Sequence, residues 1–275
     1  DLERSEILCR AGEAIGLVIE RKGHYRLTRK GAVLIGLPGV TALIEHHKIL
    51  YQDLLNPVGF FKGVEETQLS KFWPYVFGGG MDLKSSEVEK YSDLMSESQH
   101  LVAADTLAAV NIPSVCRFLD VGGGKGTFVS ELKKIHPKVD AAVFDLPGSH
   151  SETSGHRCII GSFKEDELPA GYDIISLVRI LYDHRDETIR DLLGKTYSAL
   201  DKGGRLIVSE PMLGADRPTL WGDVYFAMYT LAMSTGKTRS PDQVSGFIKD
   251  AGFSNVTIHK SARPFITTVI EAQKT

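Results

Sequence analysis

A glycine-rich run in the middle of the chain constrains the fold more than any other feature. It spans residues 118–126 (FLDVGGGKG), follows a strand pattern and opens a helical one. Glycines allow the backbone to turn tightly and approach a ligand closely, and a helix N-terminus favours a carboxylate or phosphate. A dinucleotide fingerprint needs a third glycine at position 127, where this chain has Thr127. The run therefore predicts a cofactor loop of another kind, with a tight turn that binds nothing as the alternative.

Strand and helix patterns alternate after Pro113, which predicts an α/β fold with a doubly wound parallel sheet. The strand-like runs are 117–121, 140–144, 157–160, 173–178 and 205–210, and helical patterns at 126–135 and 188–199 lie between some of them. Two final runs, 255–259 and 265–272, are too close in sequence for a helical crossover. We therefore expect an antiparallel C-terminal strand pair.

The first hundred residues are mainly helical in pattern, apart from two short alternating runs around a glycine turn. Helical patterns occupy 6–14, 41–56 and 88–110, and the alternating runs are 16–20 and 25–28. A helix leading into such a hairpin has the outline of a winged-helix module. We expect a helical, winged-helix-like domain at 1–100, lacking some N-terminal residues, and a cofactor-binding domain at 101–275.

Composition narrows the class of protein without identifying it. The 275 residues are 42% hydrophobic and 24% charged, with a net charge of −3, which is ordinary for a globular protein. We expect a cytoplasmic protein, because no apolar run approaches a membrane span and the start does not resemble a signal peptide. Three scattered cysteines predict neither a disulfide framework nor a metal site. The mild acidity gives no support to nucleic-acid binding.

Polar and aromatic residues at the ends of later strands are candidates for holding the cofactor. Asp145 ends the second strand 25 positions after Asp120, where a carboxylate can accept hydrogen bonds from both ribose hydroxyls. An N-cap or solvent-facing aspartate is the alternative. After the third strand, Phe163 and Ser162 are placed to flank an adenine, although an aromatic residue here is more often part of the core. Arg179 ends the fourth strand, where it either meets the ligand or closes the sheet.

As a set, several motifs resemble the class I S-adenosylmethionine-dependent O-methyltransferases with a winged-helix dimerisation domain. They are LDVGGGKG at 119–126, FDLP at 144–147, GSF at 161–163, LDKGG at 200–204 and AGF at 251–253. The resemblance implies a Rossmann-like seven-stranded sheet, S-adenosylmethionine as cofactor and a homodimer. The cofactor-binding residues that it implies are Asp120, Gly122, Gly124, Asp145, Leu146, Ser162, Phe163 and Arg179. Ser162 stands where the family usually has an aspartate.

A narrower resemblance is to the carotenoid branch of that family. It rests on FWPYVF at 72–77, YSDLM at 91–95, SLVRILYDH at 176–184 and GDVYF at 222–226. It implies methyl transfer to a hydroxyl of a hydroxylated carotenoid, a small apolar acceptor. Such a substrate lies in the photosynthetic membrane, so we expect at most peripheral membrane contact. A bacteriochlorophyllide or an aromatic polyketide is the alternative acceptor.

The candidate catalytic run departs from the family. Relatives usually carry His-Asp-Trp after the fourth strand, with the histidine as general base, whereas this chain has Tyr182, Asp183 and His184. An alcohol must lose its proton in the reaction, and imidazole suits that task better than free tyrosine with a pKa of about 10. Either His184 is the base, or Tyr182 orients the acceptor oxygen and the proton leaves later. Asp183 could assist either one, and a structural loop is the third possibility.

Glu210, at the end of the fifth strand, matches a position where relatives place a carboxylate near the reacting centre. A buried partner for Arg179 is the alternative role. The acceptor itself is predicted to meet residues 221–233, where aromatic and methionine side chains occupy both sides of a helical pattern. The candidate acceptor contacts are Trp221, Tyr225, Met228 and Tyr229, and plain core packing is the alternative for each.

Three other classes of protein fit less well. A winged-helix transcription factor would need a basic helix, but 6–14 carries Arg10 against Glu6 and Glu13. A nicotinamide dehydrogenase is disfavoured by Thr127 and by the antiparallel end of the sheet. A protein that binds S-adenosylmethionine without transferring its methyl group stays possible because of the unusual Tyr182.

Overall fold

The computed structural model describes residues 1–36, 38–72, 99–147 and 156–275. The chain divides into two compact units, Asp1–Ile49 and Leu50–Thr275, and each is described by itself. Residues 73–98 lie outside the described part, and with them the motif at 72–77 except Phe72, the motif at 91–95 and the first half of the helical pattern at 88–110. The second half of that pattern is helical over 99–109.

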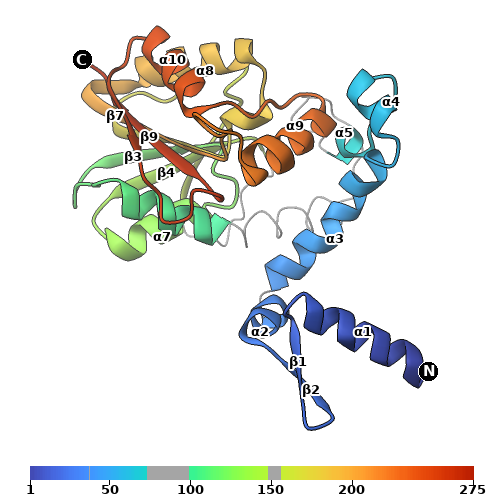
Figure 1. Ribbon diagram of the computed structural model, residues 1–275. Helices are drawn as coiled ribbons and strands as arrows, with labels where there is room; N and C mark the ends of the chain where they lie inside the picture. The colour runs from blue at the N-terminus through green and yellow to red at the C-terminus, as the bar shows by residue number, and fades with distance from the viewer. Residues whose placement is uncertain (37, 73–98, 148–155) are drawn as a thin grey trace. The chain divides into compact units, whose positions relative to one another are not determined.

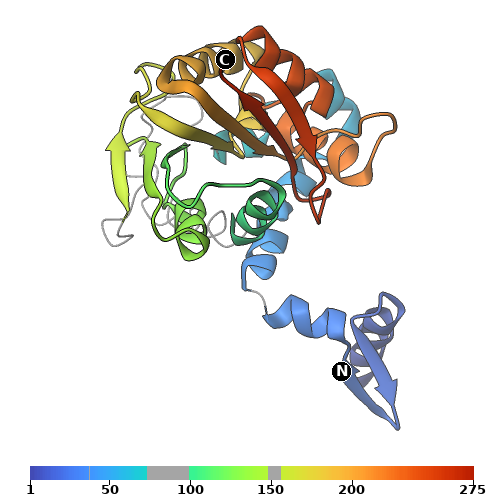
Figure 2. The same ribbon diagram turned by 90° about the vertical axis from the view of Figure 1, so that its left-hand side faces the viewer.

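The second unit contains a seven-stranded sheet in the order β5-β4-β3-β6-β7-β9-β8. The strands are β3 (Arg117–Val121), β4 (Asp140–Asp145), β5 (Arg157–Ile160), β6 (Tyr172–Val178), β7 (Leu200–Glu210), β8 (Ser254–His259) and β9 (Thr268–Gln273). The first five strands in chain order pair in parallel, and β9 pairs antiparallel with both β7 and β8 (Figures 1 and 2). The predicted methyltransferase-type sheet is therefore confirmed, and β7 begins five residues earlier than the sequence pattern predicts.

Helices cover both faces of this sheet, so its central strands are apolar on both sides. In Figure 1, α7 (Thr127–Ile135) lies on one face, and α8 (Asp186–Ala199) and α10 (Pro241–Asp250) lie on the other. Side chains alternate accordingly along β3: Phe118 packs in the cluster with α7, and Leu119 packs in the cluster with α8 and α10. The near-continuous apolar character of the predicted strands follows from this double burial.

The strand order reverses at β3. From β3 the chain passes outward to β4 and β5, then returns to the other side of β3 as β6 and β7. In such sheets, ligands bind where the order reverses, outside the carboxyl ends of the strands. The glycine run after β3 and the turn after β6 therefore meet at the same place.

The segment predicted to contact the acceptor is helical, but in two geometries. Residues Leu220–Phe226 (η4) form π-helical turns, and α9 (Ala227–Met233) continues them as an α-helix. Short π-helical segments are rare and are often found at functional sites. The sequence pattern does not distinguish the two geometries.

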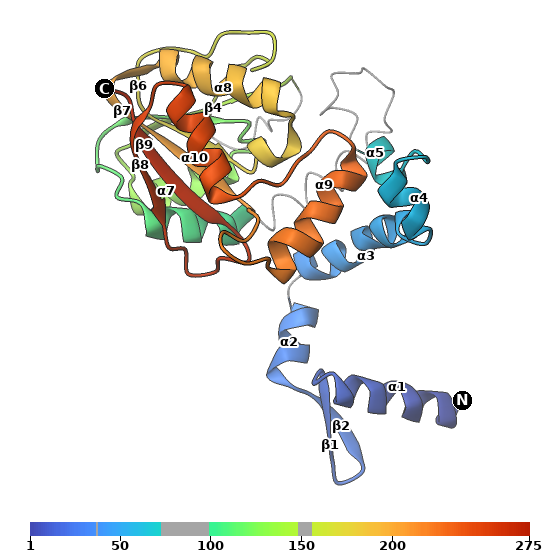
Figure 3. The ribbon, with the colours of Figure 1, turned by 45° about the horizontal axis from the view of Figure 1, so that its top comes forward.

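The compact unit that carries the sheet begins fifty residues before the predicted domain boundary at residue 100. It includes α4 (Pro57–Lys62), α5 (Gln68–Phe72) and the end of α3 (Pro38–Asp53). Near α5, the hydroxyl of Thr67 donates to the carbonyl of Ala232 in α9, and Leu69 is fully buried, so this segment packs with α9 (Figure 3). The change of sequence pattern at residue 100 does not carry this packing information.

The first unit contains α1 (Leu2–Ala14), the hairpin β1 (Val18–Arg21) and β2 (His24–Leu27), and α2 (Arg29–Gly36). The helix and the hairpin agree with the predicted patterns. No residue of α1 is buried. Across the described ranges of both units, no helix is both long enough and apolar enough to cross a bilayer.

Replacing Phe118 tests whether β3 anchors the core. Its side chain is fully buried and stacks on Phe128 of α7, with ring centroids 6.1 Å apart. We expect Phe118→Ala to lower the free energy of unfolding by about 3–5 kcal/mol, because it removes apolar burial and leaves a cavity. Urea unfolding checks this. Val115→Ala, at a position 68% exposed, is the control and should change the value by less than about 0.5 kcal/mol. A similar small change for both variants would contradict the prediction.

Candidate active site

The glycine run forms a loop whose backbone conformation favours glycine at three positions. Gly122, Gly124 and Gly126 have φ values of +71°, +53° and +77°. A Cβ atom on Gly122 would lie 2.3 Å from the side chain of Ile180, whereas one on Gly124 would have no atom of the described residues within 4 Å. The loop is therefore packed tightly against the turn after β6 at Gly122 and faces open space at Gly124.

Asp145 joins the end of β4 to this loop. Its Oδ2 accepts a hydrogen bond from the backbone N–H of Gly124 at 2.6 Å, and its Oδ1 accepts one from the N–H of Leu146, also at 2.6 Å. A carboxylate has about four acceptor sites, so both oxygens can still accept a bond from a ligand hydroxyl. The structure thus brings Asp145, Leu146 and Gly124 together as the sequence analysis predicted.

Asp120 occupies a different place from the other predicted cofactor residues. It is 1% exposed, and its Oδ1 accepts from the hydroxyl of Ser176 at 2.5 Å. A Cβ on Gly123 would lie 2.4 Å from Oδ2, and that oxygen has no hydrogen-bond partner among the residues described. Burial raises the pKa of Asp120 to about 7, against the lowering effect of Ser176 and with a further rise from the charge of Asp145. Asp120 therefore supports the loop from the sheet side.

These features fit a nucleoside-type cofactor such as S-adenosylmethionine. The missing Cβ of Gly124 leaves room for close approach, and the Asp145 carboxylate lies beside it at a strand end, the place where a carboxylate meets ribose hydroxyls in such folds. Ser162 fits less directly: its N–H donates to Asp166, and its hydroxyl accepts from the N–H of Lys164. Its hydrogen bonds thus stabilise the local turn.

A short 3₁₀ turn, η3 (Leu181–Asp183), carries Tyr182 and Asp183 of the candidate catalytic run. A residue with a strained backbone, Arg179, lies just before this turn. Arg179 links β6 to this turn with φ +60°, a conformation that costs about 1–2 kcal/mol for a residue with a side chain. Arg179 also hydrogen-bonds the side chain of Tyr182, and its charge lowers the pKa of Glu210. Arg179 therefore lies among the candidate catalytic groups.

Glu210 holds the turn by accepting hydrogen bonds from backbone N–H groups of the turn. Its Oε1 accepts from the N–H groups of Ile180 and Leu181, both at 2.8 Å. Its Oε2 accepts a longer bond of 3.4 Å from the N–H of Tyr182. Burial raises the pKa of Glu210 to about 7, although these three N–H groups favour the ionised form. Both carboxylate oxygens of Glu210 accept backbone N–H groups of the turn, so Glu210 caps the turn. The positive charge of Arg179 lowers the pKa of Glu210.

The phenol group of Tyr182 and the carboxyl group of Asp183 are both buried. The ring of Tyr182 meets Phe226 of η4 edge-on, with centroids 6.3 Å apart. Burial raises the pKa of the Tyr182 phenol, and the charge of Asp183 raises it further. Burial likewise raises the pKa of Asp183 far above its usual range, and within the described chain its buried Oδ1 has no partner. Tyr182 is thus a neutral phenol beside the segment predicted to bind the acceptor.

His184 has different neighbours. Its ring meets Phe163 edge-on at a centroid distance of 5.3 Å. Burial lowers the pKa of His184 to about 4, helped by the charges of Lys164 and Arg239. The two residues that competed for the role of base are therefore separated: Tyr182 packs toward η4 and His184 packs toward Phe163.

The predicted acceptor contacts gather on η4 and α9. Tyr225 lies between Phe226 and Tyr229, with ring centroids 4.7 and 6.0 Å away, and burial raises its pKa to about 12. Tyr229 is buried and Met228 is half-buried, whereas Trp221 is 37% exposed and meets Phe265 edge-on at 6.2 Å. The segment is therefore not buried on all sides as the pattern suggests.

Arg239 was not predicted, and Phe226 lies in the predicted 221–233 segment without being one of the named acceptor contacts. Phe226 contacts Tyr182, and Arg239 bonds to the backbone of the catalytic turn. A cation directly before the Ser240–Gln243 capping box was the only available sequence signal for Arg239. Nothing in the sequence indicated which carbonyl groups it would meet.

Solved structures share this fold at low sequence identity. The methyltransferase CalO1 of calicheamicin biosynthesis, solved with S-adenosylhomocysteine bound, aligns over 100% of this chain and 84% of its own, with a TM-score of 0.81 and 19% identity. Human N-acetylserotonin methyltransferase, solved in complex with S-adenosylmethionine, aligns over 100% and 84%, with a TM-score of 0.71 and 22% identity. These likenesses establish the fold.

Gly124→Ala tests the role of the loop. We expect it to weaken S-adenosylmethionine binding by about tenfold or more, measured by calorimetry, because the new Cβ enters the open space beside the loop; tenfold corresponds to about 1.4 kcal/mol. Gly203→Ala is the matched control, since Gly203 also has a positive φ (+80°) and no atom within 4 Å of a new Cβ. Both variants carry similar backbone strain. Equal affinities in the two variants would show that the loop does not face the cofactor.

Sequence comparisons extend the match to a family. A model of the O-methyltransferase domain matches residues 51–254. Demethylspheroidene O-methyltransferase of Rhodobacter capsulatus is 44% identical over 99% of this chain and 70% of its own length, and its namesake in Cereibacter sphaeroides is 41% identical over 98% and 74%. The 3-hydroxy-5-methyl-1-naphthoate 3-O-methyltransferase of Streptomyces sahachiroi is 26% identical over 98% and 81%. With the sheet, the glycine loop and these matches in agreement, the chain belongs to the O-methyltransferase family.

Proposed function

We propose that this protein transfers the methyl group of S-adenosylmethionine to a hydroxyl of a hydroxylated carotenoid. The observation that carries the proposal is the 44% identity to a demethylspheroidene O-methyltransferase over 99% of the chain, which includes both the loop and the acceptor segment. The geometry agrees, because the cofactor loop and the turn with Tyr182 meet at the carboxyl ends of β3 and β6.

S-adenosylmethionine supplies an activated methyl group, so the protein must align the acceptor oxygen, exclude water and accept one proton. Asp145 and Gly124 would hold the nucleoside portion, and Phe163 would pack beside the adenine. His184 supports Phe163 from its edge, and its lowered pKa keeps it neutral near pH 7.

On the acceptor side, Tyr182 orients the hydroxyl that is methylated and Asp183 accepts its proton. Tyr182 suits the first role because it is a neutral phenol bonded to Arg179 and packed on Phe226 of the acceptor segment. Asp183 suits the second because its pKa is raised and its Oδ1 is buried without a partner in the described ranges. Tyr225, Tyr229, Met228 and Trp221 would line the acceptor path.

We also propose that the protein is a homodimer joined through the Asp1–Ile49 unit. No residue of α1 is buried, and its apolar residues Leu2, Ile7 and Leu8 are strongly exposed. Exposed apolar surface of this kind is typical of an interface. Sedimentation equilibrium should give twice the chain mass of 30.2 kDa, and a monomer at micromolar concentration would contradict this.

Membrane contact, on this proposal, is peripheral. A carotenoid partitions into the bilayer, so the enzyme must meet its acceptor at the membrane surface. Flotation with vesicles that contain the carotenoid tests this, and vesicles without it are the control. The same binding to both kinds of vesicle would show that the substrate does not recruit the enzyme.

The direct test of function is a mass-spectrometric assay with isotopically labelled S-adenosylmethionine and a detergent-dispersed 1-hydroxy carotenoid. Labelled methoxy carotenoid is the expected product. If the cofactor binds but no label moves, a bacteriochlorophyllide and an aromatic hydroxy acid become the next acceptors, the latter because of the naphthoate-methylating relative. If the cofactor does not bind to the folded protein, the proposal fails as a whole.

Single substitutions in the turn separate the proton-handling residues. We expect Tyr182→Phe and Asp183→Asn each to lower kcat by about 100-fold, the usual scale of lost acid–base or orienting groups. His184→Phe keeps an aromatic ring against Phe163 and should lower kcat by less than about fivefold. The opposite order, with His184→Phe the most damaging, would assign the base to His184.

A further inference from the structure

Arg239 is a buried cation attached to the candidate catalytic turn, although it lies outside the predicted site. Its side chain is 2% exposed and donates from all three of its nitrogens. Nη1 bonds to the carbonyl of Leu181 at 3.2 Å, and Nη2 bonds to the carbonyl of His184 at 2.9 Å. One guanidinium therefore spans the turn, from its first residue to the residue after it.

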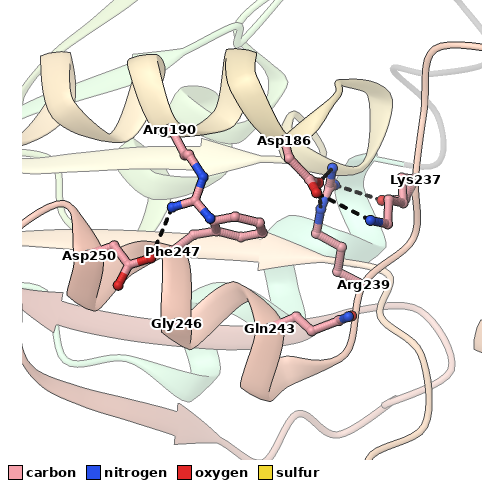
Figure 4. Close-up of a pocket in the computed structure, with 8 residues that line it drawn as sticks. All are labelled: Asp186, Arg190, Lys237, Arg239, Gln243, Gly246, Phe247 and Asp250. Atoms are coloured by element: carbon pink, nitrogen blue, oxygen red, sulfur yellow. Dashed lines mark hydrogen bonds and ion pairs between the residues drawn. The ribbon is translucent and has the colours of Figure 1, made fainter.

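The guanidinium is also held by groups outside the turn. Nε and Nη2 donate to Oδ1 of Asp186, the first residue of α8, at 2.9 and 2.6 Å, and Nη1 donates to the carbonyl of Lys237 at 2.7 Å (Figure 4). A planar guanidinium with several fixed donors is suited to bind carbonyls and a carboxylate in a single geometry. Arg239 therefore behaves as a rigid connector between the turn and the start of α8.

The segment before Arg239 reinforces the same contact. The N–H of Lys237 donates to the carbonyl of Tyr182 at 2.8 Å. A Cβ on Gly236 would lie 2.7 Å from that carbonyl oxygen, so the two backbones are closely packed. This segment follows α9, which carries candidate acceptor contacts, and it therefore connects the acceptor helix to the turn.

Two opposite charges bind the backbone of the turn. The carboxylate of Glu210 accepts the N–H groups at its start, and the guanidinium of Arg239 binds carbonyls along it. A helical turn has partial positive charge at its N–H end and partial negative charge at its carbonyl end, so both ions have the favourable sign. We infer that Arg239 is a positioning residue for methyl transfer, which together with Glu210 fixes the turn that presents Tyr182 to the acceptor.

This inference rests on the proposed function. It predicts that replacing Arg239 changes the rate of methyl transfer more than the affinity for the cofactor. In the described part of the chain the hydrogen bonds of Arg239 go to Leu181, His184, Asp186 and Lys237, none of them in the glycine loop, so its replacement should leave cofactor affinity unchanged. A displaced Tyr182 would misalign the acceptor, and a misplacement of about 1 Å can cost about 100-fold in rate. Lysine at this position keeps the charge but cannot span both carbonyls and the carboxylate.

The test compares Arg239→Lys with Arg190→Lys in the full-length protein. Arg190 is the control because its guanidinium carbon lies 4.5 Å from the centroid of the Phe247 ring, and that of Arg239 lies 5.7 Å from the same centroid (Figure 4). Arg190 pairs with Asp250, and no hydrogen bond of the described structure joins it to the turn. With the labelled-methyl assay we expect R239K to lower kcat by about 10- to 100-fold, with the cofactor Kd within about twofold. R190K should keep both values within about twofold.

Two results would overturn the inference: an R239K enzyme with the kcat of wild type, or one whose loss is explained by weaker cofactor binding. If R239K does not fold, Asp186→Asn takes its place, since it weakens the anchor of Arg239 and leaves the carbonyl contacts. We expect D186N to lower kcat about three- to tenfold, and an unchanged kcat would count against the inference. An inactive wild type would refute the proposed function itself, whereas an active wild type with an equally active R239K would refute only the role of Arg239.

Discussion

The buried carboxylate of Glu210 is the interaction on which the candidate site depends. It ends β7, the longest strand, and accepts three backbone N–H groups from the turn after β6. Burying a carboxylate is costly unless hydrogen bonds compensate it, and these N–H groups provide that compensation. The turn is therefore fixed to the sheet by a carboxylate whose two oxygens both accept backbone N–H groups of the turn. Without such a cap, Tyr182 and Asp183 would sit on a short loop with little to define their directions.

The cofactor loop is fixed by a similar arrangement on the neighbouring strands. Asp120 supports the glycines from within the sheet, and Asp145 binds the N–H of Gly124 from the end of β4. Ile180, at the start of the turn, packs closely on Gly122: a Cβ atom there would lie 2.3 Å from the Ile180 side chain, which would have to shift. The loop and the turn are consequently packed against each other at Gly122.

Much of the fold and half of the site could be predicted because the relevant signals are local. The parallel sheet with an antiparallel final pair follows from the alternation of patterns and the short last connection, and the position of Asp145 follows from its place at a strand end. The sequence could not separate Tyr182 from His184, since the two are only two positions apart and both chemistries are plausible. Their separation depends on Phe226 and Phe163, which lie more than forty positions and about twenty positions away in the chain. Likewise, a glutamate at the end of a strand looks the same whether it faces a substrate or caps a turn.

The sequence by itself determined the seven-stranded sheet, the family and the loop that would hold the cofactor. Glycine spacing and apolar periodicity depend only on residues that are close together in the chain. Only the tertiary structure decided that Glu210 caps the turn, that His184 packs away from the acceptor segment and that Arg239 joins the site. Those assignments depend on which side chains meet across the fold, and distances between remote residues are set by packing rather than by local pattern.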